Sequence, residues 1–198
     1  MDSLDAPEDD RRGRLLEAAA RLLGEEGPAA LTTRRLAREV GTSTMAVYTH
    51  FGGMPDLVRE IVAEGFARLE RRVATVPTTD DPMLDLRALA AAYLANAREN
   101  PHLYAVMFGS ASLGGYRLSE DERAVGLVAF GQLVAGIVRA MDAGRLRAGD
   151  PAAVAGQVWT ALHGFVMIEL AGFDHVVPDP ERDLLWPMLG NLISALAA

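Results

Sequence analysis

The chain has 198 residues, half of them hydrophobic, with 19 basic residues against 27 acidic residues and no cysteine. This length suits one ordinary domain with a small module attached, and the hydrophobic fraction allows a sizeable core. The absence of cysteine excludes disulfides, thiolate metal sites and cysteine nucleophiles, and it suits a reducing compartment. We therefore expect a cytoplasmic protein.

Neither export nor membrane insertion is expected. The first ten residues carry five acidic residues and no basic one, whereas a secretory signal has a basic start followed by an apolar run. Further along, the apolar stretches are interrupted by Gly, Arg or His before they reach the ~20 residues that a membrane-spanning helix needs. Residues 1–10 are predicted to form a disordered acidic tail.

Charge is distributed unevenly along the chain. The net charge of −8 disfavours nucleic-acid binding for the chain as a whole. Residues 11–60, however, hold eight arginines against six acidic residues, which leaves a small positive balance. No lysine occurs in the sequence, so arginine must supply the permanent cationic contacts. Any contact with nucleic acid is therefore expected within residues 11–60.

In the N-terminal third, apolar residues recur every three or four positions, which predicts amphipathic helices. Thr32 and Ser43 are good N-caps for two short helices, and Gly41 lies in the turn between them. Pro55 stands at the first position of a longer helix. The four predicted helices run from Arg11 to Gly24, from Thr32 to Gly41, from Thr44 to about His50 and from Pro55 to about Ala74.

Residues 76–82 form a polar break with two prolines and two aspartates, which predicts a boundary between modules. Beyond it the pattern is again helical, and Pro187, after Trp186, is expected to bend the last helix. No strand-like alternation and no internal repeat occurs, so the predicted class is all-α with about nine helices. The later helices are predicted at 83–100, 101–108, 121–143, 151–171 and 180–196, with a loop rich in Gly, Ser and Ala at 109–118.

Two short capped helices joined by a glycine-containing turn form a helix-turn-helix, in which the second helix can enter a DNA major groove. Arg34 and Arg35 lie in the first turn of its first helix, where cations oppose the helix dipole. Such a pair is unusual in a purely structural helix and natural in one that faces phosphates. Met45 and Ala46 are predicted to be exposed and to touch a thymine methyl. The alternative is a plain helical hairpin with capping threonines, and periodicity alone does not decide between them.

The run LTTRRLAREVGTSTMAVYTHFGGMPDLV closely resembles the N-terminal domain of the tetracycline-repressor (TetR) family, over about residues 11–66. The hallmark is a Leu-Thr start, a Gly in the turn and a Tyr-x-His-Phe ending. The resemblance implies that Tyr48 and His50 hold phosphate oxygens, that Thr49 lies near a base or sugar, and that Phe51 is a core residue. The predicted DNA-binding residues are Thr33, Arg34, Thr42, Ser43, Thr44, Met45, Tyr48, Thr49 and His50.

One position departs from this family. The family usually has a lysine two residues after the Phe-Gly pair, where this chain has Met54. A phosphate contact should therefore be missing. This predicts weaker DNA binding with a salt dependence lower by about one charge per subunit.

Residues 83–198 resemble the ligand-sensing domain of the family, in the subtype named for a Trp-His-Gly signature. The matching residues are Trp159, His163 and Gly164, and a second matching block is ENPHLYAVMFG, residues 99–109. The general composition is that of a small-molecule site, apolar with a few polar groups. The alternative is that these side chains are ordinary core residues, with His163 satisfied by a neighbouring carbonyl or by Thr160. The predicted ligand pocket is lined by Tyr104, Met107, Phe108, Trp159, His163 and Met167.

Neither a metal, nor a cofactor, nor catalysis is expected. No ligand spacing supports metal sensing by His102, His163 and His175 with Glu169 or Asp174. Ser110 and Ser112 lie in the predicted loop, without the Gly-x-Ser-x-Gly elbow of a hydrolase. The alternative to a regulator is a small-molecule-binding or catalytic helical protein whose N-terminal hairpin is incidental.

The last two predicted helices are rich in small and aliphatic residues, and in the family the equivalent pair forms a four-helix bundle between two chains. We predict a two-fold homodimer through these helices. The resemblance implies a ligand-responsive repressor that binds a palindromic operator in double-stranded DNA and an unknown small-molecule effector. A regulator without a ligand, or an activator, is a further alternative. The predicted parts are the acidic tail (1–10), the helix-turn-helix DNA-binding domain (11–54), a connecting helix (55–76) and a ligand-sensing and dimerisation domain (83–198).

Overall fold

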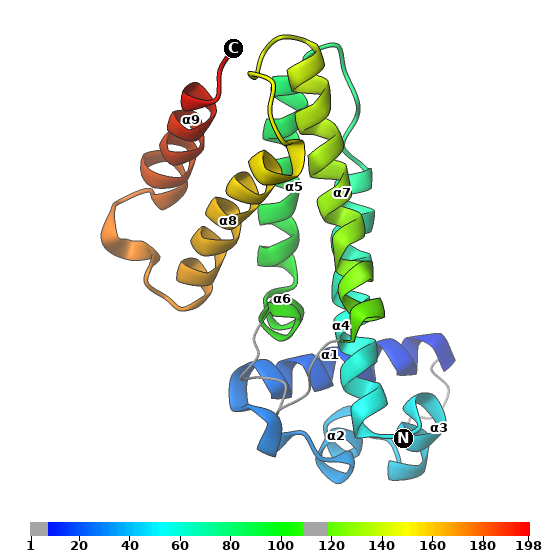
Figure 1. Cartoon of the computed structure of the whole chain (residues 1–198). Coiled ribbons are helices and arrows are strands. Elements are labelled where there is room, and N and C mark those ends of the chain that lie inside the picture. The colour runs from blue at the N-terminus through cyan, green and yellow to red at the C-terminus, as the bar shows by residue number, and fades with distance from the viewer. Residues whose placement is uncertain (1–7, 109–118) are drawn as a thin grey trace. The chain divides into compact units, whose positions relative to one another are not determined.

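The computed structural model describes residues 8–108 and 119–198, and its regular elements in these ranges are helical (Figure 1). The predicted all-α fold is therefore confirmed. Short 3-10 turns occur at Pro28–Ala30 and Asp174–Val176, and a π-helical turn at Glu181–Leu185. The α-helices are α1 (Glu8–Glu26), α2 (Thr33–Val40), α3 (Thr44–Phe51), α4 (Met54–Ala74), α5 (Pro82–Glu99), α6 (Pro101–Phe108), α7 (Glu120–Asp142), α8 (Pro151–Leu170) and α9 (Trp186–Ala195).

The chain forms two compact units. Unit 1 comprises Met1–Arg68 with Asn100–Val125, and unit 2 comprises Leu69–Glu99 with Gly126–Ala198. Helix α6 follows the polar break in sequence, yet it packs in unit 1 against α1. The two units thus divide the chain differently from the predicted functional domains.

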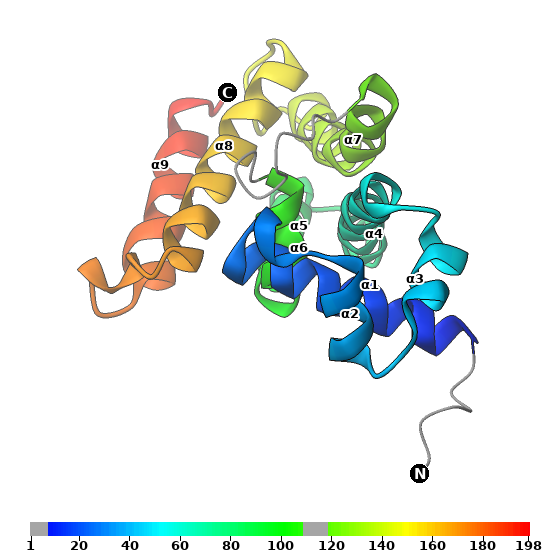
Figure 2. The same ribbon diagram turned by 90° about the horizontal axis from the view of Figure 1, so that it is seen from below.

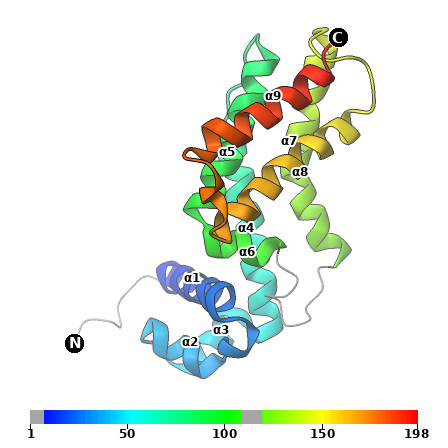
Figure 3. The same ribbon diagram turned by 90° about the vertical axis from the view of Figure 1, so that its left-hand side faces the viewer.

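In unit 1, α1 lies between α6 on one side and α2 and α3 on the other (Figures 1 and 3). Helix α1 extends beyond its predicted bounds at both ends, because residues 8–10 of the predicted tail are helical and the helix continues through Gly24. The expected stop at Gly24 is wrong. The chain leaves the helix at Gly27, whose φ of 81° is in the left-handed region that favours glycine.

The caps of α2 and α3 lie where the sequence predicts them. The Thr32 hydroxyl accepts the Arg35 N–H at 3.2 Å, and the Ser43 hydroxyl accepts the Ala46 N–H at 3.1 Å. Gly41 ends α2 with a φ of 71°. Side-chain acceptors at N-caps and a left-handed glycine at the C-terminus satisfy backbone groups that a helix leaves unpaired. These local rules explain why two helices of eight residues each are formed here.

In unit 2, α8 and α9 lie side by side (Figure 2), and α8 also packs against α5. Gly136 on α7 allows a close approach to α5, because a Cβ atom at this position would lie 2.9 Å from Leu86 Cδ2. A π-helical turn ends at Leu185 and α9 begins at Trp186, while the bend expected at Pro187 stays a prediction. The core of this unit includes Leu86, Ile137, Ala140, Leu146, Val154, Ala155 and Leu196.

Arg98, in the last turn of α5, forms ion pairs on both sides of the segment that follows α8, with Glu169 before it and Glu181 after it. Its Nε and Nη2 groups donate to Glu169 Oε1 at 3.0 and 2.8 Å, and its Nη1 group donates to Glu181 Oε2 at 2.7 Å. Hydrogen bonding to Glu169, and then to Glu181, raises the pKa of Arg98 above its ordinary value. Trp186 Nε1 donates to the other Glu181 oxygen at 3.0 Å. One guanidinium thus joins the end of α8 to the start of the π-helical turn.

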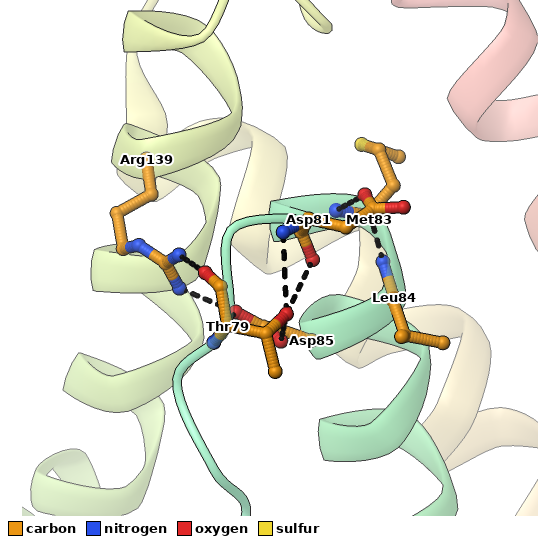
Figure 4. Close-up of polar contacts among 6 residues, drawn as sticks. All are labelled: Thr79, Asp81, Met83, Leu84, Asp85 and Arg139. Carbon is orange, nitrogen blue, oxygen red and sulfur yellow. Dashed lines mark hydrogen bonds and ion pairs between the residues drawn. The ribbon is translucent and has the colours of Figure 1, made fainter.

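A second ion pair closes the loop between α4 and α5 (Figure 4). Asp85 is buried, and its carboxylate accepts the Thr79 hydroxyl at 2.7 Å, the Thr79 N–H at 2.9 Å and Arg139 Nη1 at 2.6 Å. Arg139 also donates to the Thr79 carbonyl. The Thr79 hydroxyl, followed by Arg139, lowers the pKa of Asp85 from 3.8 to about 2. The loop is therefore held by the ionised form of Asp85.

We expect Asp85→Asn to lower the melting temperature by several degrees at neutral pH. Because the folded-state pKa is depressed, Asp85 stabilises the fold above pH 3.8, and this stabilisation is lost as the pH falls towards about 2. The difference in melting temperature between the wild type and Asp85→Asn should shrink over that window, as measured by calorimetry. Asp80→Asn, an exposed neighbour in the same loop, is the control and should follow the wild type. A pH-independent difference would contradict the assignment.

Two helical segments of the described residues, Ala124–Asp142 in α7 and the whole of α8, are long and apolar enough to cross a membrane by length and composition. The expectation that the apolar stretches are too short for this criterion is therefore wrong. The Gly and Arg residues within α7 do not interrupt the helix. Core helices of soluble proteins meet the same criterion, so it gives only weak support for a membrane location.

Candidate nucleic-acid interface

Helix α3 has one buried face and one exposed face. Val47 and Phe51, four residues apart, are buried, and the Arg12 guanidinium of α1 lies 5.6 Å from the centre of the Phe51 ring. The predicted core position of Phe51 is confirmed. On the opposite face Met45 is 71% exposed and Tyr48 is 52% exposed. Thr44 and Thr49 are exposed beside them. A thioether and three hydroxyl groups therefore line one side of this helix.

The hydroxyl groups near the turn are partly engaged within the protein. Ser43 uses its oxygen as the N-cap acceptor of α3, and its hydroxyl hydrogen is not needed for this bond. Thr49 donates its hydroxyl to the Met45 carbonyl at 3.0 Å, so in this rotamer it offers a ligand an acceptor rather than a donor. Thr42 is half-buried, and its N–H donates to the Ala37 carbonyl at 2.8 Å. His50 is half-buried next to Phe51, with 6.0 Å between the ring centres.

Thr33, at the start of α2, donates its hydroxyl to the sulfur of Met54 at 3.4 Å. A thioether is a weak acceptor, so a phosphate oxygen would be a stronger partner for the same hydroxyl. Met54 occupies the position where the family usually has lysine, and it is half-buried at the start of α4. The side chain at this position therefore contacts Thr33 and supplies no charge.

The two arginines in the first turn of α2 differ in their surroundings. Arg34 is exposed and makes no ion pair with any described residue. Arg35 instead forms a two-pronged ion pair with Glu26 of α1, with N–O distances of 2.8 and 2.6 Å. The expectation that both cations face phosphates is therefore wrong for Arg35. Sequence alone did not show it, because Glu26 lies nine residues away on another helix.

The predicted pocket residues on α6 belong to unit 1. Tyr104 and Met107 are buried, and Phe108 is half-buried. The Phe108 ring lies 4.8 Å from that of Tyr104 and 5.8 Å from that of Phe66, measured between ring centres. These side chains pack as part of the core of unit 1.

The predicted pocket residues on α8 belong to unit 2. Trp159 is 37% exposed, donates Nε1–H to the Tyr93 hydroxyl at 3.2 Å, and lies 5.7 Å from the His163 ring between centres. Burial lowers the pKa of His163, so its imidazole is neutral near pH 7. The Phe130 ring of α7 packs edge-on at 6.0 Å from Trp159. Tyr93 and Phe130 were missed from sequence, because only the packing of α5, α7 and α8 brings them to Trp159.

The six predicted pocket residues thus form two groups, one in each unit, and a shared pocket stays a prediction. Of the metal ligands considered from sequence, His102 lies 3.6 Å from Glu25, and no group of three or more acidic or histidine residues in the described ranges is placed to hold a metal ion. Ser110 and Ser112 lie outside the described residues.

Unit 1 also has an open groove of about 790 Å³ between α1, the end of α2 and α6. Its lining is charged, with Arg14, Arg21, Glu17 and Glu39 among the residues. These groups already pair within the protein, since Arg14 contacts Asp10 and Arg21 contacts Glu39. The groove therefore combines ion-paired charged groups with apolar surface, to which Ala18 and Val40 belong.

Two models of known protein families match the chain, one in its N-terminal part and one in its C-terminal part. The family model "Bacterial regulatory proteins, tetR family" matches residues 15–61, and the model "Tetracyclin repressor-like, C-terminal domain" matches residues 86–189. An uncharacterized HTH-type transcriptional regulator of Mycobacterium tuberculosis, Rv0681, is 28% identical over 190 residues, covering 94% of this chain and 80% of that protein.

Further relatives agree with this assignment. The nucleoid occlusion factor SlmA of Marinobacter nauticus is 31% identical over 143 residues, 70% of each chain. A TetR transcription regulator from Haloarcula marismortui has the same fold, with a TM-score of 0.76 and 25% identity over 96% of this chain and all of that chain. The C-terminal match does not distinguish the Trp-His-Gly subtype, which stays a prediction. Since that match alone covers more than half of the sequence and the N-terminal match covers the helix-turn-helix, the chain belongs to the TetR family and is a DNA-binding transcriptional regulator.

Proposed function

We propose that this regulator is a ligand-responsive repressor that binds a palindromic operator as a homodimer in the cytoplasm. The observation that carries the proposal is the exposed face of α3, where Met45 and Tyr48 have no role in the core. Residues 11–54 would bind DNA, 55–76 connect, and 83–198 sense the ligand and dimerise. The proposed DNA contacts are Thr33, Arg34, Thr42, Ser43, Thr44, Met45, Tyr48, Thr49 and His50.

In this proposal α3 enters the major groove. Met45 then contacts a thymine methyl, the apolar group that distinguishes thymine in this groove. Tyr48 donates its hydroxyl to a phosphate and fixes the register of the helix. Two subunits related by a two-fold axis place their α3 helices in successive major grooves, roughly 34 Å apart. Base preference and affinity therefore both depend on the dimer.

The effector is proposed to act on the distance between the two reading helices. A ligand that contacts Trp159, His163 and Met167 shifts the equilibrium only if it prefers the separation that does not fit DNA. Helix α4 would carry this shift, because it begins next to the helix-turn-helix and continues into unit 2. A small molecule of largely apolar character suits these side chains, and the neutral imidazole of His163 suits an uncharged polar group.

The function is tested by a mobility-shift assay with the DNA upstream of the chain's own gene, with salt varied between lanes. A shift that weakens with salt is expected, since phosphate contacts release counterions. The absence of a shift on every genomic fragment would overturn the proposal. A thermal-shift screen against a metabolite library tests the effector, and a reporter fused to the bound promoter separates repression from activation.

The proposed dimer face needs a correction in detail. Ala155 and Val158 of α8 and Leu189 of α9 are among the small and aliphatic residues of the two helices predicted to form the dimer, and they are buried within unit 2 itself. Their apolar surface is therefore already covered. The contact between two chains must fall on side chains that stay exposed. The large aliphatic candidates are Ile168, at 48% exposure, Leu184, at 38%, and Leu170, at 37%.

We expect Ile168→Arg to convert the dimer to a monomer without lowering the melting temperature. A buried, unpaired charge at an interface costs several kcal/mol, whereas the same arginine on a free surface costs little. Light scattering across a dilution series measures the molar mass. Leu84→Arg is the matched control, because Leu84 is 57% exposed on α5. A dimer that survives Ile168→Arg would place the interface elsewhere.

A further inference from the structure

In unit 1 five of the eight arginines in residues 11–60 form ion pairs with carboxylates. The ion pairs join Arg12 to Glu60, Arg14 to Asp10, Arg21 to Glu25 and Glu39, Arg35 to Glu26, and Arg59 to Asp56. Arg34 and Arg38, both on α2, are exposed and make no ion pair with the described residues. The slight positive balance of this segment is therefore concentrated on one short helix.

These two arginines lie on one face of α2. Side chains four residues apart on an α-helix are neighbours, with about 5–6 Å between their Cβ atoms. Like charges at this spacing destabilise a helix by a few tenths of a kcal/mol, and no carboxylate of the described residues offsets the repulsion here. Arg38 lies in the last turn of α2, where a cation favours the helix dipole, but an anionic partner would offset the repulsion between the two arginines further.

The face that carries Arg34 and Arg38 is turned away from α1. The neighbouring flank of α2 is tied to α1 by Arg35 and Glu39, which pair with Glu26 and Arg21. Leu36 and Ala37 point into the core. In Figures 1 and 3 both α2 and α3 lie on the same side of α1. The helix that carries the two unpaired guanidinium groups therefore lies on the same side of α1 as α3.

We propose that α2 forms a second, sequence-independent DNA contact in which Arg38, one helical turn beyond Arg34, binds the phosphate backbone. This inference rests on the proposed function. A guanidinium matches a phosphate with two parallel hydrogen bonds, which makes arginine suited to this contact. Thr33 and Arg34 contact the backbone at the start of α2, and Arg38 extends that contact by about 6 Å along the helix axis. Arg38 then supplies the charge that Met54 does not.

The test measures the salt dependence of DNA affinity. The probe is a labelled duplex that the wild-type protein selects from a random library, together with a duplex of unrelated sequence, both followed by fluorescence anisotropy. In Arg38→Gln the slope of log K against log salt should be shallower by about 0.9 per subunit, on both duplexes alike, because a phosphate contact is independent of base sequence. Arg38→Lys keeps the charge and should keep the slope.

Arg145→Gln is the matched control. Arg145 is also exposed and without an ion pair among the described residues, but it belongs to unit 2. Its loss removes the same charge and should leave the slope unchanged. An unchanged slope in Arg38→Gln, or an equal fall in Arg38→Gln and Arg145→Gln, would overturn the contact while DNA binding itself stands. A wild-type protein that binds neither duplex would overturn the proposed function, and the contact with it.

Discussion

A chain that carries both Tyr48→Phe and His50→Ala is expected to bind DNA about a thousandfold more weakly than the wild type. Each lost hydrogen bond to a phosphate contributes about 1 kcal/mol, and a dimer loses two in each subunit. The sum corresponds to roughly three powers of ten in affinity. Tyr48 is 52% exposed, so removal of its hydroxyl leaves the core intact. Fluorescence anisotropy on the selected duplex measures the loss.

The control for this variant is His175→Ala, which removes an exposed histidine from unit 2. It should bind as the wild type does, and both variants should keep the wild-type helical content. His50 is half-buried beside Phe51, so the single change His50→Gln, which keeps a polar side chain of similar size, separates a packing loss from a lost contact. If the double variant bound DNA as strongly as the wild type, the carboxyl end of α3 would not be part of the DNA contact.

Gly65→Val is expected to lower the free energy of unfolding by about 3 kcal/mol, because it overpacks a full core. A Cβ atom at position 65 of α4 would lie 2.6 Å from Met107 Cγ of α6 and even closer to its sulfur. Met107 is buried, so it has little room to move away. For a chain of this size the loss corresponds to a fall of roughly 6–12 °C in melting temperature, which a thermal melt measures.

The matched control is Gly13→Val, in α1 of the same unit, where nothing lies within 4 Å of the added Cβ. This change carries only the low helix propensity of valine. Combining Gly65→Val with Met107→Ala should recover part of the lost stability, because the shortened side chain vacates the space. If the two glycine variants melted at the same temperature, the close approach of α4 and α6 would not be a constraint.

The features predicted correctly from sequence depend on residues close together along the chain. Thr32 and Ser43 cap helices that begin at the next residue, and Gly41 ends one within the same stretch. Pro101 and Pro151 likewise begin helices, because proline fits the first turn, where its missing N–H is not needed. Such signals involve a few neighbouring backbone groups, so the start or end of a helix at these positions depends on residues close in sequence.

The features that sequence did not predict depend on distant residues. Arg35 has the composition of a phosphate ligand, but Glu26 on another helix binds it. Gly65 is an unremarkable helix residue until Met107 packs across it. Helix α6 follows the polar break, yet its contacts are with α1. In each case the deciding partner lies on another helix, and no periodicity within one helix contains that information.

At the candidate site, too, local features could be predicted from the sequence, whereas contacts between helices could not. The exposure of Met45 was expected, and the resemblance to the family implied the burial of Phe51. The engagement of Thr33 by Met54 was not expected, because it depends on how α4 begins relative to α2. The pocket residues were found as two sequence blocks, and their distribution over two units was not foreseen.

The Arg98 ion pairs also determine how the chain between α8 and α9 tolerates change. Glu169 and Glu181 meet at one guanidinium, so residues 171–180 form a loop whose two ends are held at a common point. The entropy of closing such a loop grows only with the logarithm of its length, by about 0.6 kcal/mol for each doubling. Added residues would therefore weaken the docking of α9 very little as long as both carboxylates remain. Variation in length is best accommodated at this point of the fold.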